Sequence, residues 1–246
     1  MTNNDHKIAV LIPAYNEANS IERVVHGIRA TNPGADIVVI NDGSSDRTAA
    51  RAEKAGATVL SLAVNLGYGA ALQTGYKYAV LNGYDYTVQI DGDGQHDPKF
   101  IGELIAALES GSDVAIGSRF LQNLGTYDNP AMRQLGMMFF RFLIYLFIKR
   151  RITDPTSGFQ ALNRNVVEFF AKSRQYPADF PDADIIILLH YAGFKVSEVP
   201  VIMYNNETGK SMHSGFKPIY YILKMLLSIY AVLFGKEQIA NIHHAS

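Results

Sequence analysis

The residues whose types and spacing best suit chemistry are Asp91, Asp93 and Gln95, in the segment DGDGQ directly after an apolar stretch. In an extended chain, residues two apart face the same way. Two carboxylates and an amide oxygen so close repel each other unless a cation lies between them. Oxygen-only ligand sets suit Mg²⁺ or Mn²⁺. The spacing therefore predicts a divalent-metal site; the alternative is a pair of solvated aspartates, because Asp-Gly is common in turns.

A second polar cluster, NDGSSD, follows the apolar residues 37–40. Its Asp42 is a candidate acceptor of hydrogen bonds from a base or a ribose, whereas Asp46 is equally suited to cap a helix. The segment Gly67-Tyr68-Gly69 lacks the third glycine of a dinucleotide-binding loop, and a Walker A motif is absent. The sequence therefore disfavours a dinucleotide-binding fold and a P-loop.

The elements that must position these residues alternate between strand-like and helix-like over roughly the first 115 residues. We predict strands at 7–13, 37–40, 57–62, 84–90 and 113–116, and helices at 21–28, 46–55, 69–81 and 99–108. This rhythm is typical of βαβ units and a mostly parallel sheet, in which ligands bind beyond the carboxyl ends of the strands. The polar clusters at 16–17, 41–42, 65 and 91–93 each follow a predicted strand, so we expect them to meet at one edge.

Composition narrows the classes of function. The 246 residues are 48% hydrophobic and 18% charged, which excludes intrinsic disorder and allows a large core. A net charge of −1 disfavours a nucleic-acid partner. With no cysteine, the chain has no disulfide, zinc–thiolate site, iron–sulfur cluster or thiol nucleophile. We expect no signal-peptide core, and no apolar run reaches the ~20 residues that a membrane span needs.

Two segments combine apolar and basic residues without any acid. Residues 129–153 contain MMFFRFLIYLFI followed by Lys149-Arg150-Arg151, and residues 208–236 contain IYYILKMLLSIYAVLF. Apolar helices with basic flanks fit the surface of an anionic membrane. We therefore predict membrane contact; the alternative is that both are ordinary buried helices. The simplest division is a catalytic domain at 1–211 and a C-terminal amphipathic helical extension at 212–246.

The chain resembles family 2 glycosyltransferases, and more narrowly the polyprenyl-phosphate sugar synthases of the dolichyl-phosphate mannosyltransferase type. Six segments carry the resemblance in order: IPAYNE, VVINDGSSDRT, NLGYGAALQTGYKYA, QIDGDGQHDP, GSRF and DPTSGFQALNR. It covers roughly residues 7–211 and implies a GT-A fold, an α/β architecture with a Rossmann-like, mostly parallel sheet flanked by helices. A nucleotide-sugar half then adjoins an acceptor half.

The resemblance also implies roles for individual residues. The nucleotide would be held by Pro13, Tyr15, Glu17, Asp42 and Asp91, with Lys210 closing over it. Mg²⁺ or Mn²⁺ on the diphosphate would be held by Asp91, Asp93 and Gln95, and the acceptor's phosphate by Arg119 and Arg133. Asp182 and Asp184 in FPDAD are the candidate general bases if one is required; the alternative is that both are acids at a helix N-terminus. Gln160 and Tyr204-Asn205-Asn206 stand where relatives often carry basic residues, which leaves the donor sugar open.

Residues and resemblance together predict a metal-dependent hexosyltransferase. It would transfer a sugar, with inversion, from a UDP- or GDP-sugar to undecaprenyl or dolichyl phosphate. A phosphate monoester is largely dianionic near neutral pH, so it needs positioning by arginine more than a base. We expect a peripheral protein on the cytoplasmic face of the membrane, with a small membrane protein as a plausible partner. The alternatives are a transferase that adds a sugar such as rhamnose to a glycan hydroxyl, and a non-catalytic membrane scaffold.

Overall fold

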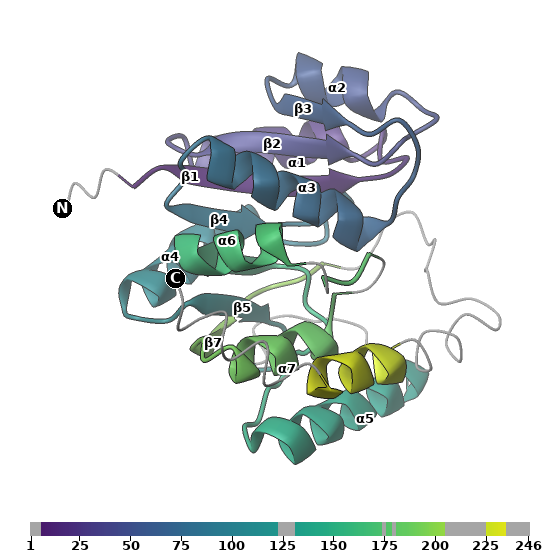
Figure 1. Ribbon diagram of the computed structural model, residues 1–246. Coiled ribbons are helices and arrows are strands. Elements are labelled where there is room, and N and C mark those ends of the chain that lie inside the picture. The colour runs from purple at the N-terminus through teal and green to yellow at the C-terminus, as the bar shows by residue number, and fades with distance from the viewer. Residues whose placement is uncertain (1–5, 123–130, 174–175, 179–180, 205–224, 235–246) are drawn as a thin grey trace.

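A seven-stranded sheet lies between two layers of helices (Figure 1). The computed structural model describes residues 6–122, 131–173, 176–178, 181–204 and 225–234, apart from the side chains of residues 131–133 and 135. The alternation of strands and helices confirms the predicted α/β class.

The sheet has the strand order β3-β2-β1-β4-β6-β5-β7. The strands are β1 (Ile8–Ala14), β2 (Asp36–Asn41), β3 (Thr58–Ser61), β4 (Tyr86–Gln89), β5 (Val114–Ser118), β6 (Gln160–Asn163) and β7 (Val196–Pro200). All neighbours pair in parallel except at β6, which runs antiparallel to both β4 and β5. The first five strands match the predicted ones to within a few residues, whereas β6 and β7 lie beyond the stretch for which strands are predicted.

The helices divide between the two faces of the sheet. One face is covered by α3 (Tyr68–Leu81), α6 (Arg164–Lys172) and α7 (Ala183–Tyr191), and α5 (Ala131–Ile148) lies outside α7. The other face carries α1 (Ile21–Thr31), α2 (Thr48–Lys54) and α4 (Ile101–Glu109), which follows the 3₁₀ turn η1 (Pro98–Phe100). Because both faces are covered, β1 and β2 read as continuous apolar runs instead of alternating ones.

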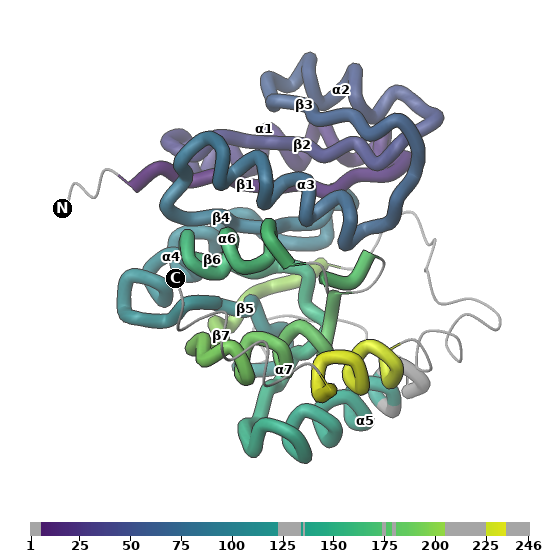
Figure 2. Tube along the Cα trace, in the orientation of Figure 1, coloured from purple at the N-terminus to yellow at the C-terminus, as the bar shows by residue number. Residues whose placement is uncertain are grey.

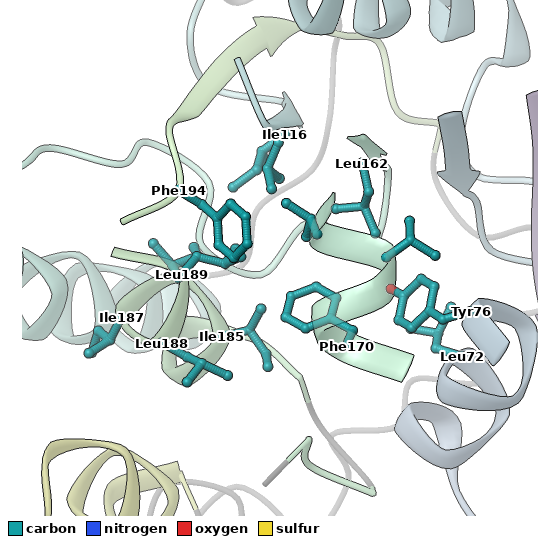
Figure 3. Close-up of a cluster of buried hydrophobic side chains, with 14 of the residues drawn as sticks. Leu72, Tyr76, Ile116, Leu162, Phe170, Ile185, Ile187, Leu188, Leu189 and Phe194 are labelled. Atoms are coloured by element: carbon teal, nitrogen blue, oxygen red, sulfur yellow. The ribbon is translucent and has the colours of Figure 1, made fainter. Parts of the chain in front are cut away.

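The larger core cluster joins α3, α6 and α7 to the sheet (Figure 3). Tyr76 of α3 and Phe170 of α6 are fully buried, with ring centroids 5.6 Å apart. Every residue of α7 from Ala183 to Leu189 is buried, because the helix has the sheet on one side and further helices on the other.

A helix at residues 225–234 lies beside α5 and α7 (Figure 2). Its Met225, Ile229 and Val232 are buried and belong to the larger core cluster. This part of the predicted extension therefore packs on the same core as the sheet. The boundary at residues 211 and 212 lies outside the described residues and stays a prediction.

The carboxyl ends of β1, β2 and β4 meet at one edge of the sheet. Past the strands, Asp42 N donates a hydrogen bond to Ala14 O at 2.9 Å. Asn16 Oδ1 accepts one from Ser45 N at 2.9 Å, and Glu17 N donates to Thr48 Oγ1 at 2.8 Å. The expectation that the polar clusters after these strands lie together is confirmed.

We expect Gly69→Ala to destabilise the protein, because α3 begins against the backbone of residues 177–178. A Cβ at position 69 would lie 1.9 Å from Pro177 O, and Ala70 N donates to Ala178 O at 3.0 Å. Displacing this backbone should lower the free energy of unfolding, measured by urea denaturation, by about 1–3 kcal/mol. Gly102→Ala in α4 is the control, since nothing lies within 4 Å of its added Cβ; it should raise that free energy by about 0.5–1 kcal/mol. Equal effects of the two changes would contradict the close approach.

Candidate active site

Asp91 is the centre of the site, just beyond the end of β4. Its Oδ1 accepts a hydrogen bond from Tyr68 Oη at 2.8 Å, and its Oδ2 lies 3.2 Å from His96 Nε2. Gly158 passes so close that an added Cβ would lie 2.9 Å from Asp91 Oδ2. Three segments therefore fix one carboxylate: the start of α3, the loop after β4 and the segment before β6.

Asp93 and Glu17 add negative charge beside Asp91. Burial and the charge of Asp91 raise the pKa of Asp93 to about 6. Burial also raises the pKa of Glu17, and the charge of Asp91 adds to the effect. The pKa of Asp91 itself is lowered, because hydrogen bonds and charge from His96 and the Tyr68 hydroxyl outweigh its burial. A partly buried cluster of carboxylates with this charge pattern suits a divalent cation.

His96 is a site residue that the sequence analysis did not single out. Its side chain is 2% exposed, and its ring lies 5.2 Å from that of Phe159. Its Nδ1 has no hydrogen-bond partner in the described part of the chain. The chain turns at Gly94, where φ is +79°, and this turn brings His96 back toward Asp91. No periodicity in the sequence marks such a contact.

The expectation of an extended chain from Asp91 through Gln95 is wrong. Strand β4 ends at Gln89, whose side chain is buried and accepts a hydrogen bond from the Tyr76 hydroxyl. Gln95 N donates to Asp93 Oδ1 at 2.9 Å, and Gln95 Nε2 donates to Tyr204 O at 3.1 Å. The loop is a turn closed by its own hydrogen bonds, so strict alternation stops where the strand stops.

The predicted metal ligands lie around this turn. Asp93 and Gln95 line a cavity of about 300 Å³, together with Tyr204 and Arg23. Within the described residues, no group of three or more His, Asp or Glu side chains is arranged as a metal site. The oxygen donors nevertheless fit a hard cation in type and charge. The ligand set of Asp91, Asp93 and Gln95 therefore stays a prediction.

The predicted nucleotide-binding residues lie at the same edge. Pro13 is buried in β1 and pairs with Ile40 of β2, and Tyr15 is 50% exposed. Asp42 is 3% exposed, and its two oxygens accept hydrogen bonds from Leu66 N at 2.7 Å and Gly67 N at 3.0 Å. Asp42 thus fastens the loop that leads into α3, and its contact with a nucleotide stays a prediction. Lys210 lies outside the described residues.

Arg119 at the end of β5 forms a buried ion pair with Asp154. Arg119 Nε lies 2.6 Å from Asp154 Oδ2, and Arg119 Nη2 lies 2.6 Å from Oδ1. The Asp154 side chain is fully buried and that of Arg119 is 7% exposed. The guanidinium expected at the acceptor's phosphate is therefore already engaged by a carboxylate that the sequence analysis did not assign. The side chain of Arg133, the other predicted phosphate ligand, lies outside the described residues.

Asp184 is buried within the protein, and its role as a general base stays a prediction. The residue is 1% exposed and lies in the first turn of α7, which agrees with the alternative of an acid at a helix N-terminus. Its Oδ1 accepts hydrogen bonds from Asp182 N and Ile185 N, and its Oδ2 accepts one from Ser228 Oγ. A general base must reach a proton of the substrate. Asp182, the other acid of FPDAD, lies near the site, because its charge adds to burial and to the charge of Asp91 in raising the pKa of Tyr68 well above its ordinary value.

Comparison with known proteins identifies the family to which the sequence is similar. The model of "Glycosyl transferase family 2" matches residues 9–170. The polyprenol monophosphomannose synthase of Mycolicibacterium smegmatis is 32% identical over 84% of this chain and 80% of its own. The dolichol-phosphate mannosyltransferase of Pyrococcus furiosus is 34% identical over 89% of this chain and 62% of its own.

A solved structure shows the same fold. Glucosyl-3-phosphoglycerate synthase from Mycobacterium tuberculosis superposes with a TM-score of 0.65 at 21% identity, covering 94% of this chain and 80% of that one. The same enzyme has been crystallised with Mn²⁺ and UDP-glucose. The likeness confirms the predicted GT-A architecture.

The burial and crowding of the carboxylates predict how the free energy of unfolding depends on pH. The pKa of Asp93, about 6 in the folded protein, exceeds its value near 4 in an unfolded chain. The folded state therefore loses stability as the pH rises from about 4 to 6. Asp93→Asn should raise the free energy of unfolding of the metal-free protein by about 1–3 kcal/mol at pH 7, with little change at pH 4. Urea denaturation in EDTA at both pH values measures this.

Asp97→Asn is the matched control for Asp93→Asn. Hydrogen bonds from Lys99 lower the pKa of Asp97 despite its partial burial. Removing that charge should therefore leave stability at pH 7 unchanged or lower it. A loss of stability in metal-free Asp93→Asn at pH 7 would contradict the cost of keeping a charged Asp93 buried beside Asp91.

Proposed function

Because the chain belongs to glycosyl transferase family 2, we propose that it transfers a sugar from a nucleoside-diphosphate sugar to a polyprenyl phosphate at a membrane surface. The observation that carries the proposal is the cluster of Asp91, Asp93 and Glu17 at the carboxyl edge of the sheet. Relatives that match most of this chain are named for transfer of mannose to polyprenol or dolichol phosphate.

The carboxylate cluster supports a metal-dependent reaction with a diphosphate leaving group. When bound, Mg²⁺ or Mn²⁺ would neutralise the charge that develops on that group. Asp91 and Asp93 would hold the cation, and Tyr68 and His96 would orient Asp91 through their hydrogen bonds. A similar fold has been crystallised with Mn²⁺ and UDP-glucose. We leave the base and the sugar open between UDP- and GDP-linked donors.

The residues expected near the acceptor, Arg119, Arg133 and Asp184, support a phosphate group as the nucleophile. A phosphate monoester attacks as a dianion and needs no strong base, and the one acid buried in α7, Asp184, is committed to hydrogen bonds within the protein. Arg133 would position the phosphate. Arg119 would act through Asp154, by fixing the segment that leads to Gly158. In-line displacement with inversion at the anomeric carbon is part of the proposal.

Exposed apolar side chains support a peripheral position on the membrane. In α5, Phe142 is 60% exposed, and in the helix at 225–234, Leu227, Tyr230 and Phe234 are 69%, 58% and 77% exposed. Exposed basic residues at 149–151 follow α5. Among the helices described, none is both long enough and apolar enough to span a bilayer. We place the protein on the inner face of the membrane, where a small membrane protein would be a suitable partner.

The direct test combines the purified chain, Mn²⁺, undecaprenyl phosphate in detergent and a panel of UDP- and GDP-sugars. We expect one donor to give a lipid-linked sugar phosphate, detected by mass spectrometry, and we expect EDTA to abolish it. Hydrolysis of a donor without a lipid product would contradict the polyprenyl phosphate acceptor. A product without any metal would contradict the role of the carboxylate cluster.

Tyr68→Phe tests the orientation of Asp91 without changing the charge of the site. Losing the hydroxyl that donates to Asp91 Oδ1 should raise the Mn²⁺ concentration for half-maximal activity about 10- to 100-fold. Tyr78→Phe in the same helix is the control, because the Tyr78 ring packs against that of Tyr84, with 6.4 Å between the ring centroids, whereas it is the Tyr68 hydroxyl that donates to Asp91. An unchanged Mn²⁺ dependence of Tyr68→Phe would refute the supporting role of the hydroxyl.

Asp182→Asn separates the two acceptor classes. With a phosphate acceptor no general base is needed, so we expect the rate of sugar transfer to stay within about a factor of ten of the unmodified protein. A glycan hydroxyl acceptor would require a base, and losing it costs typically about 10²- to 10⁴-fold. Initial rates with saturating donor measure the effect. A loss of the larger size would favour the hydroxyl acceptor and contradict the proposal.

A further inference from the structure

A second pocket, of about 370 Å³, lies between α5 and residues 151–153. Its charged lining residues are Arg141 and Arg151, and no acid lines it within the described part of the chain. The rest of the lining is mainly apolar and aromatic: Phe120, Phe142, Tyr145 and Ile152. A mostly apolar pocket with two cations at its wall selects for an anion that carries apolar groups.

Arg141 is held in one orientation. Its Nε donates a hydrogen bond to Thr153 O at 2.7 Å, and its Cζ lies 5.1 Å from the centre of the Phe120 ring. Its Nη2 is buried and has no hydrogen-bond partner in the described part of the chain. A buried donor left unpaired costs free energy, so such groups in folded proteins almost always have an acceptor. The fixed guanidinium of Arg141 therefore favours binding of an anion in the pocket, which would accept this hydrogen bond.

Glu198 lies near the pocket, but its carboxylate is hydrogen-bonded to other groups. Glu198 accepts hydrogen bonds from Thr153 N, Thr153 Oγ1 and Asp154 N at 2.8–2.9 Å. These bonds fix the segment whose carbonyl orients Arg141. Arg119 also contacts the Phe120 ring, at 5.3 Å, but it is paired with Asp154 and does not line the pocket. The pocket therefore presents the positive charge of Arg141 and Arg151 apart from the ion pair at the end of β5.

We infer that this pocket binds the phosphate of a membrane phospholipid, at a site separate from the sugar acceptor's. Phe142 and Tyr145, which line the pocket, are 60% and 47% exposed, and Met138 is 56% exposed. Their spacing of three and four places them on one face of α5. This apolar face and the exposed Arg150 would lie in the interface, with Arg141 facing a headgroup phosphate. The inference rests on the proposed position at the membrane surface.

Isothermal titration calorimetry with dihexanoylphosphatidic acid, below its critical micelle concentration, tests this on the full chain. We expect saturable binding that is at least tenfold tighter than that of inorganic phosphate or dihexanoylphosphatidylcholine. Arg141→Gln should weaken it about 10- to 100-fold, as expected for the loss of a hydrogen bond to a charged group. Arg150→Gln is the matched control, because Arg150 is exposed beside the pocket but does not line it. The affinity of this variant for dihexanoylphosphatidic acid should equal that of the unmodified protein.

Arg151→Gln provides a second variant, because Arg151 is exposed and its loss should not affect folding. It should also weaken binding of the short-chain lipid. Equal affinity for inorganic phosphate, or unchanged affinity in both Arg141→Gln and Arg151→Gln, would overturn the inference. A further kinetic result would also overturn it. If Arg141→Gln raised the KM for undecaprenyl phosphate, in phospholipid-free detergent, by the same factor by which it weakened binding of the short-chain lipid, the pocket would be the binding site of the sugar acceptor. The calorimetry needs neither donor nor sugar transfer, so its result stands apart from that of the proposed function.

Discussion

Burying a carboxylate costs free energy unless hydrogen bonds or a cation compensate its charge, and Arg119 supplies both to Asp154. Their two short hydrogen bonds join the end of β5 to the segment that leads into β6. That segment carries Gly158, whose backbone lies against the carboxylate of Asp91. Removing either partner would leave a buried charge unpaired, which typically costs about 3–5 kcal/mol, and would release the wall of the site at the same time. The ion pair therefore supports the fold and the orientation of Asp91 together.

The site itself works against folding. Asp91, Asp93 and Glu17 crowd negative charge into a partly buried space, and burial together with the repulsion from Asp91 raises the pKa of Asp93. The protein tolerates this because Tyr68 and His96 hydrogen-bond to Asp91 and because the core beneath is large. Such a balance is common at functional sites, where charge is placed for a ligand and the stability is supplied elsewhere. A bound cation would attract all three carboxylates and so outweigh the repulsion among them.

The elements of the first half could be predicted because each is local. Apolar runs mark β1 and β2, and the spacing of Ile21, Val24, Val25 and Ile28 marks the buried face of α1. The predictions fail where contacts between distant segments decide the structure. Arg119 and Asp154 are 35 residues apart, and His96 turns toward Asp91 through a positive φ at Gly94 that no alternation reveals. The hydrogen bond from Ser228 to Asp184, across 44 residues, is another such contact between distant segments.

The antiparallel strand β6 also determines the order in which the molecule can be assembled. Strands β1 to β4 come from the first 89 residues and pair with one another, so this half of the sheet can form early. Strand β5 has only β6 and β7 as neighbours, so it stays unpaired until residues 160–163 arrive. Pairing of β6 with β4 closes the sheet and brings Gly158 to Asp91 in one event. During synthesis, a chain that has folded only its first half thus holds its acidic loop without the opposing wall, and the site is completed only with the sheet.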